Sequence, residues 1–87
     1  VGEWVDYYRK DEIAFKGLYK NDKKDGPWIW YYMNRGERGE QGNVMSEVDF
    51  RNGELITEEC YTREDGEIIN CQEIFGEDDY RFADRKN

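Results

Sequence analysis

The chain has 87 residues, of which 16% are aromatic and 39% are charged, and its formal net charge is −8. It contains no histidine, so a Ser–His or Cys–His nucleophile cannot be built and the commonest zinc ligand is missing. No run of apolar residues approaches the ~18 that a transmembrane helix needs. The composition predicts one small domain whose thin core is built from large aromatic side chains.

The net charge is unevenly distributed along the chain. Residues 1–44 hold 8 basic and 8 acidic side chains, whereas residues 45–87 hold 5 basic and 13 acidic ones. The acidic half would repel phosphate backbones and anionic membrane surfaces, so nucleic-acid binding is not expected and membrane-surface contact is disfavoured. It would attract and steer a basic protein partner, while the alternative is that it only keeps a small protein soluble.

Apolar and polar residues alternate with period two in segments that are separated by turn signals, and this pattern predicts an all-β fold. The chain is expected to form an antiparallel meander of about six strands, near residues 3–9, 13–20, 27–33, 43–51, 54–62 and 67–75. Residues 35–43, with three glycines among charges, are predicted to be a flexible loop. Residues 1–75 then form a domain of β-hairpins, and residues 76–87 form an acidic polar C-terminal tail.

A sequence repeat with an offset of 24 residues is visible in the first half. Its two copies are Gly2-Glu3-Trp4-Val5-Asp6-Tyr7-Tyr8 and Gly26-Pro27-Trp28-Ile29-Trp30-Tyr31-Tyr32. Weaker copies begin at Gly53 and Gly66. Turn dipeptides that tolerate positive φ punctuate these units, among them Asn21-Asp22, Asp25-Gly26, Asn52-Gly53 and Asp65-Gly66.

The stretch from Leu18 to Asn34, LYKNDKKDGPWIWYYMN, resembles the MORN-repeat variant found in many bacterial proteins. The unit of that family is roughly a tyrosine, Asn-Gly, Lys-Lys-x-Gly-x-Trp and then a pair of aromatics. The resemblance implies β-hairpins that stack side by side into an elongated sheet. It also implies functions based on binding, which include immunity (antitoxin-type) proteins and scaffolds, and it carries over no catalytic residue.

The predicted strand at 27–33 has apolar residues on both faces, and Trp28, Trp30 and Tyr32 share one of them. A single sheet cannot bury both faces unless something covers the second. One interpretation is that the aromatics stack within the core of the sheet. The other is that they form an exposed patch that contacts a protein partner or stacks on carbohydrate.

Cys60 and Cys71 flank Asp65-Gly66 symmetrically. A two-residue turn there would place the two cysteines directly opposite each other, and a three-residue turn would make them diagonal. The spacing is compatible with a disulfide and equally with two reduced thiols. A disulfide would point to a secreted or periplasmic location. No CxxC motif is present, so no metal site is expected.

Glu58, Glu59 and Glu64 surround the last predicted hairpin and are the candidate contacts for a basic partner. The alternative is an ordinary solvated surface, and the spacing does not match a calcium-binding EF-hand loop. We therefore expect a non-catalytic protein-interaction module without a cofactor, for which an immunity-type inhibitor of a basic protein is the favoured form and a cytoplasmic location would follow. The alternatives are a secreted domain that binds carbohydrate through its aromatics and a structural subunit of a larger assembly.

Overall fold

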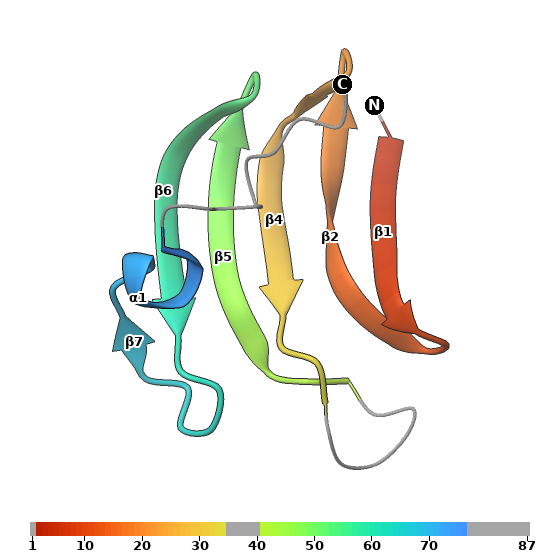
Figure 1. The fold of residues 1–87 in the computed structure, drawn as a ribbon. Helices are drawn as coiled ribbons and strands as arrows, with labels where there is room; N and C mark the ends of the chain where they lie inside the picture. The colour runs from red at the N-terminus through yellow and green to blue at the C-terminus, as the bar shows by residue number, and fades with distance from the viewer. Residues whose placement is uncertain (1, 35–40, 77–87) are drawn as a thin grey trace.

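The computed structural model describes residues 2–34 and 41–76, which fold around one antiparallel sheet (Figure 1). Its long strands are β1 (Gly2–Arg9), β2 (Glu12–Lys20), β4 (Gly26–Tyr31), β5 (Val44–Arg51) and β6 (Glu54–Tyr61). Two short strands, β3 (Lys23–Lys24) and β7 (Ile68–Ile69), pair with β2 and β6, and a four-residue helix, α1 (Gln72–Phe75), follows. The spatial order β1-β2-β4-β5-β6-β7 confirms the all-β meander expected from the sequence.

Tight turns with positive φ angles connect neighbouring strands. Asn52 and Gly53 have φ angles of 53° and 86° and join β5 to β6, where the sequence predicted a turn. Asn21 and Asp22 have φ angles of 55° and 67° and lead from β2 into β3. Two-residue turns of this kind need positive φ at both central residues, which glycine, asparagine and aspartate adopt more readily than other residues.

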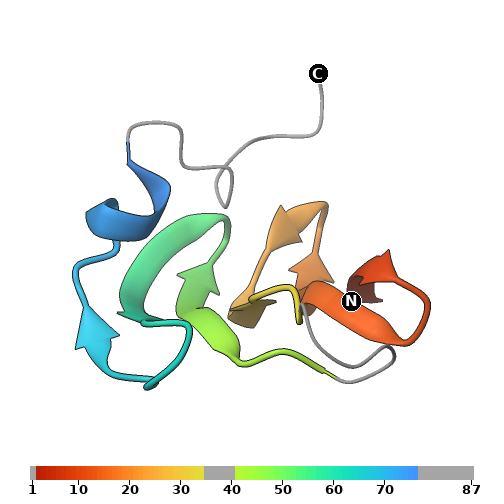
Figure 2. The same cartoon turned by 60° about the horizontal axis from the view of Figure 1, so that its bottom comes forward.

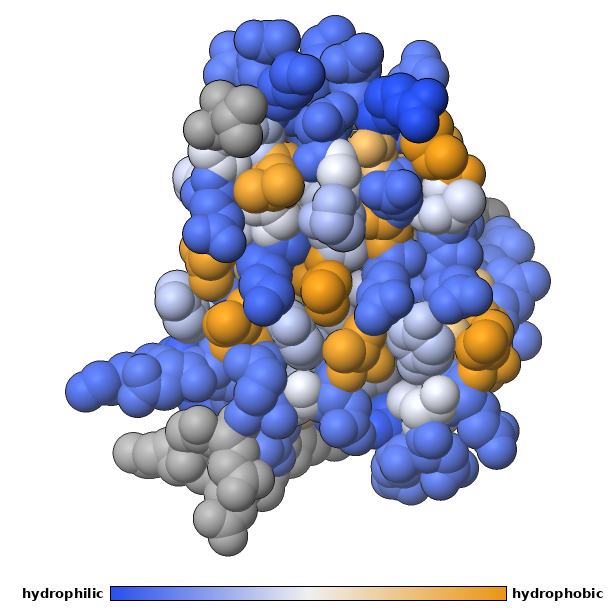
Figure 3. Space-filling model, turned by 180° about the vertical axis from the view of Figure 1, so that it is seen from behind, coloured by the Kyte–Doolittle hydropathy of each residue, from blue (hydrophilic) through white to orange (hydrophobic). Residues whose placement is uncertain are grey.

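The core lies on one face of the sheet, which we call the front face and which also carries α1 (Figure 2). Its buried members are mainly aromatic and come from β4, β5, β6 and α1; they are Trp28, Trp30, Met45, Val48, Phe50, Cys60 and Phe75. The opposite, back face presents apolar side chains scattered among polar ones (Figure 3). The sheet therefore buries one face and leaves the other accessible.

Trp28 is the centre of this core. Its side chain is fully buried, and its indole N–H donates to the carbonyl oxygen of Leu18 at 2.8 Å. The rings of Tyr19 and Phe50 meet it edge-on, with ring centroids 5.1 and 6.5 Å from its own. Gly17 leaves the space that the indole occupies, since a Cβ there would lie 2.0 Å from Cδ2 of Trp28.

A buried carboxylate ties the start of β2 to the segment that follows β4. Glu12 has no exposed surface, and its carboxylate accepts hydrogen bonds from Nε of Arg9 at 2.5 Å and from the backbone N–H of Asn34. Arg9 also donates to the carbonyl oxygen of Asn34. The hydrogen bond from Asn34 is the main reason why the pKa of Glu12 lies below its ordinary value of 4.5, and Arg9 acts in the same direction.

The predicted strand at 67–75 is wrong beyond Ile69, where pairing with β6 ends. The side-chain oxygen of Asn70 accepts the backbone N–H of Gln72 at 2.9 Å, and its carbonyl oxygen accepts the N–H of Glu73 at 2.9 Å. These local bonds satisfy backbone groups that a continuing strand would have to pair elsewhere, so the chain turns into α1.

Two further expectations concern residues that lie mostly outside the described part of the chain. Of the loop predicted at 35–43, residues 41–43 are described and have no regular structure. Of the tail predicted at 76–87, only Gly76 is described, and it ends α1 with a φ angle of 63°.

Replacing Gly17 by alanine should destabilise the fold, because the new methyl group would collide with the indole of Trp28. We expect the free energy of unfolding to fall by about 1–3 kcal/mol, the range for an overpacked core. Gly2→Ala is the matched control, since a Cβ on Gly2 meets nothing within 4 Å. Urea denaturation followed by tryptophan fluorescence measures both variants, and equal stabilities would contradict the proposed collision.

Glu12 should make the stability depend on pH. Because its pKa is lower in the folded chain than in the unfolded chain, its stabilisation is fully present above the ordinary value of 4.5 and is lost as the pH falls through the folded-state pKa. Glu12→Gln should lower Tm at pH 7 and flatten the loss of Tm between about pH 5 and about pH 2. Thermal unfolding followed by circular dichroism measures this, with Glu3→Gln on the exposed side of β1 as the control. A Glu12→Gln curve parallel to the wild-type curve would disprove the assignment.

Candidate functional site

The aromatic residues predicted to contact a partner lie mostly in the core. Trp28 and Trp30 are 0% and 3% exposed, so for both residues the interpretation as core aromatics holds and the alternative of an exposed patch does not. Tyr32 is half-buried and donates its hydroxyl to the carbonyl oxygen of Tyr61 at 2.7 Å, while the guanidinium of Arg63 lies 4.6 Å from the Tyr32 ring. Burial also raises the pKa of Tyr32. These residues therefore offer no open platform on which a sugar could stack.

The three glutamates predicted to bind a basic partner do not form one cluster. Glu58 pairs with Val48 of the core and so belongs to the front face, whereas Glu59 pairs with Glu47 and belongs to the back face. Side chains alternate between faces along a strand, which separates these two neighbours. Glu64 lies beyond β6, in the loop that precedes β7. Glu58 and Glu59 both line the site described next, but only Glu59 belongs to the face on which the other carboxylates of that site lie.

An open groove of about 650 Å³ crosses the back face over β4, β5 and β6. The face on which it lies is the one seen in Figure 3. Two rows of cross-strand neighbours on the back face line it, with Ile29, Glu47 and Glu59 in one row and Pro27, Asp49 and Thr57 in the other. The row between them, whose residues belong to the front face, also lines it and consists of Trp28, Val48 and Glu58. This acidic groove, which we define by its six back-face residues, combines apolar surface from β4 with three back-face carboxylates from β5 and β6.

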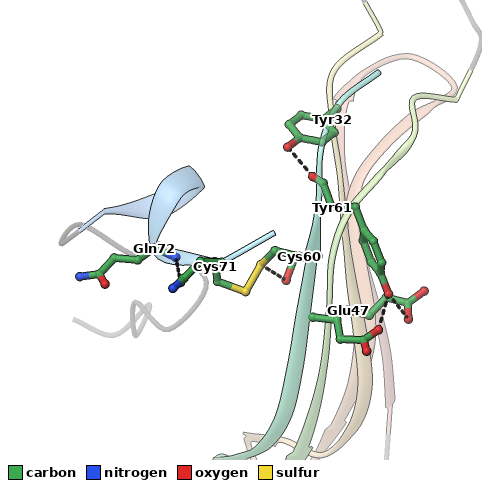
Figure 4. Close-up of a disulfide and its surroundings, with 9 residues drawn as sticks. Tyr32, Glu47, Cys60, Tyr61, Cys71 and Gln72 are labelled. Atoms are coloured by element: carbon green, nitrogen blue, oxygen red, sulfur yellow. Dashed lines mark hydrogen bonds between the residues drawn. A yellow bond between two sulfur atoms is a disulfide. The ribbon is translucent and has the colours of Figure 1, made fainter. Parts of the chain in front are cut away.

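Glu47 and Glu59 lie directly opposite each other across β5 and β6, a position in which like charges destabilise a sheet. The hydroxyl of Tyr61 lies 2.7 Å from Oε1 of Glu59 and 3.4 Å from Oε1 of Glu47 (Figure 4). The bond to Glu59 is the main reason why the pKa of Tyr61 is raised above its usual value. Because the phenol has one proton to donate, both carboxylates keep acceptor capacity for a bound cation.

The groove has the chemistry to hold the side chain of lysine or arginine. Such a side chain has an apolar stem, which would pack on Ile29 and Pro27, and a charged end, which would meet the carboxylates. A metal ion would need at least three ligands close together, and the described residues contain no such group of acidic or cysteine side chains.

A disulfide joins Cys60 to Cys71, whose Cα atoms are 5.2 Å apart (Figure 4). Neither the two-residue nor the three-residue turn considered at Asp65-Gly66 occurs, because residues 62–67 form a longer loop and Cys60 lies opposite Ile69. The bridge therefore does not connect two paired strand positions. It ties the segment that enters α1 to β6 and so holds the helix against the core.

Glu47 and Asp49 complete the acidic groove but were not among the predicted contacts. Their signal is present in the sequence, since alternation in β5 places both on the face opposite to Val48 and Phe50. What the alternation alone does not indicate is that Glu59 of β6 stands directly beside Glu47, because that depends on the register of the two strands.

Comparisons with models of known families, with curated proteins and with solved structures find no match. The resemblance to MORN-type repeats therefore stays a prediction carried by residues 18–34. Among the residues that the structure describes, no helix has the length and the apolar character needed to cross a membrane.

Reduction of the Cys60–Cys71 disulfide should lower the free energy of unfolding. The chain-entropy estimate for a loop closed between residues 11 apart is about 2–3 kcal/mol. Urea denaturation with and without dithiothreitol measures the difference, and the double variant Cys60→Ala/Cys71→Ala, which cannot form the bridge, should not respond to the reductant. An intact mass that does not increase by two hydrogens on reduction would show that the bridge is absent.

Proposed function

We propose that this protein is a non-catalytic protein-interaction module that binds a basic segment of a partner protein in the acidic groove. The observation that carries the proposal is the pairing of Glu47 directly opposite Glu59 beside the apolar surface of Ile29. Like charges directly opposite each other destabilise a sheet, and a bound cationic side chain between them would remove that cost.

The magnitudes indicate how the groove would work. One exposed ion pair contributes only about 0.2–1 kcal/mol, so three carboxylates cannot hold a partner by charge alone. Their main effect would be to raise the association rate of a basic partner, while apolar contacts on Ile29 and Pro27 slow its dissociation. The groove volume of about 650 Å³ has room for a few side chains rather than for a whole domain.

The disulfide bears on where such a module would act. Disulfides form and persist in oxidising compartments, and the Cys60–Cys71 bridge holds α1 against the core. A secreted or periplasmic setting therefore fits this chain better than the cytoplasm. An immunity-type inhibitor of a basic toxin remains the particular form of the function that we propose, now in an oxidising compartment.

Removing the charge of the groove should weaken the binding of a basic peptide. The variant Glu47→Gln/Asp49→Asn/Glu59→Gln should bind octalysine at least about 10-fold more weakly than the wild type, because steering and pairing are both lost. Titration calorimetry at about 20 mM salt, where screening is weak, measures the affinity.

The control variant changes the net charge by the same amount, but its three substitutions lie elsewhere on the surface. Glu54→Gln/Glu64→Gln/Glu67→Gln removes three exposed carboxylates that do not line the groove. It should change the affinity much less. Equal losses in both triple variants would show that octalysine responds only to net charge and would refute the groove as the binding site.

A further inference from the structure

The outer side of β1 is an open edge of the sheet. β1 is the end strand, and among the described residues only β2 pairs with it (Figure 1). The backbone N–H and C=O groups that point away from β2 are available to a further strand. Pairing with β2 is regular over Gly2–Asp6, and register shifts begin after Asp6. This regular segment contains no lysine and no proline, which commonly protect edge strands.

Trp4 lies at the centre of the regular segment and is 43% exposed. Trp4 lies opposite Gly17 on one side of β2. Continuing the β2–β4 register places Trp28 opposite Gly17 on the other side, and the Trp28 indole already occupies the space above that glycine. The rings of Trp4 and Tyr19 form a T-shaped pair, with centroids 6.1 Å apart. A large apolar side chain therefore stays partly exposed on an edge strand.

The charge distribution favours a second copy of this chain at that edge. β1 and β2 belong to residues 1–44, in which basic and acidic side chains are equal in number. The acidic strand β5 is three strands away from β1, which is roughly 14 Å at ~4.8 Å per strand. That distance exceeds the ~10 Å over which charges act in 0.1 M salt.

The other edge of the sheet would not accept a second copy as readily. β7 already pairs with the end of β6 at Cys60 and Tyr61. The rest of β6 carries Glu54, Glu58 and Glu59, so two copies meeting there would bring their acidic sides together. The two edges thus differ in both backbone availability and charge.

We propose that the outer edge of β1 is a self-association surface, at which β1 of a second copy pairs antiparallel about a two-fold axis centred on Trp4. In this register Trp4 faces Trp4 of the second copy, Glu3 faces its Val5, and Gly2 faces its Asp6. All five residues of the regular segment pair, and no like charges stand directly opposite each other. A shift of two residues toward the start of β1 would place Glu3 opposite itself, and a shift toward Tyr7 would enter the irregular part of the strand.

Analytical ultracentrifugation of the whole chain from about 10 µM to about 1 mM tests the proposal, since a short strand pairing predicts a weak, concentration-dependent dimer. Trp4→Lys places a charge opposite itself and should weaken dimerisation at least about 10-fold. Leu55→Lys is the matched control, because Leu55 is 40% exposed and lies on β6, near the edge of the sheet opposite to β1. It should leave the dimer unchanged.

Hydrogen exchange on the wild type gives a second reading that needs no variant. Amides within residues 2–6 should become more protected as concentration rises, whereas those of β6 should not. A chain that stays monomeric at every concentration, a dimer that survives Trp4→Lys, or a dimer that is lost in Leu55→Lys would each overturn the proposal.

Discussion

The packing of the Trp28 indole against Gly17 determines which face of this small sheet is buried and which is exposed. A fully buried aromatic ring removes about 150–250 Å² from water, which is worth roughly 4–6 kcal/mol at 25 cal/mol per Å². That is comparable to the whole stability of a typical domain. Because Trp28 and Trp30 point to the same face, the front face becomes the core, and the missing side chain of Gly17 is what allows the rings to approach the sheet.

Once the front face is occupied, strand alternation determines what the back face presents. Ile29 lies between Trp28 and Trp30 in β4 and faces away from them, and its neighbours across the sheet are Glu47 and Glu59. A surface that only needed solubility would not require two carboxylates in directly opposed positions, where each destabilises the other. The acidic groove is in this sense a consequence of the core, and its opposed charges distinguish it from the rest of the acidic surface.

Local features of this fold could be predicted from the sequence, and features set by long-range contacts could not. The Asn52-Gly53 turn and the long strands follow from side-chain alternation and from residues that tolerate positive φ. The strand predicted at 67–75 ends at Ile69 because Asn70 offers the backbone local hydrogen bonds that compete with pairing. Whether Trp28 was buried or exposed depended on what packs on the front face, which alternation does not encode. The composition of the groove depended on the register of β5 on β6, and of its three back-face carboxylates only Glu59 was predicted.

The two proposed contact surfaces, the acidic groove and the outer edge of β1, lie on different parts of the sheet. The acidic groove lies over β4, β5 and β6, and the open edge lies at β1, so binding at one does not block the other. Pairing of β1 with β1 about a two-fold axis perpendicular to the sheet would keep both back faces on the same side. The two grooves would then lie seven strand spacings apart when measured at β5, which is roughly 34 Å along the sheet. A partner with two basic segments at that separation would bind through both grooves and gain avidity without any new contact, whereas a partner with a single basic segment would gain nothing from the dimer.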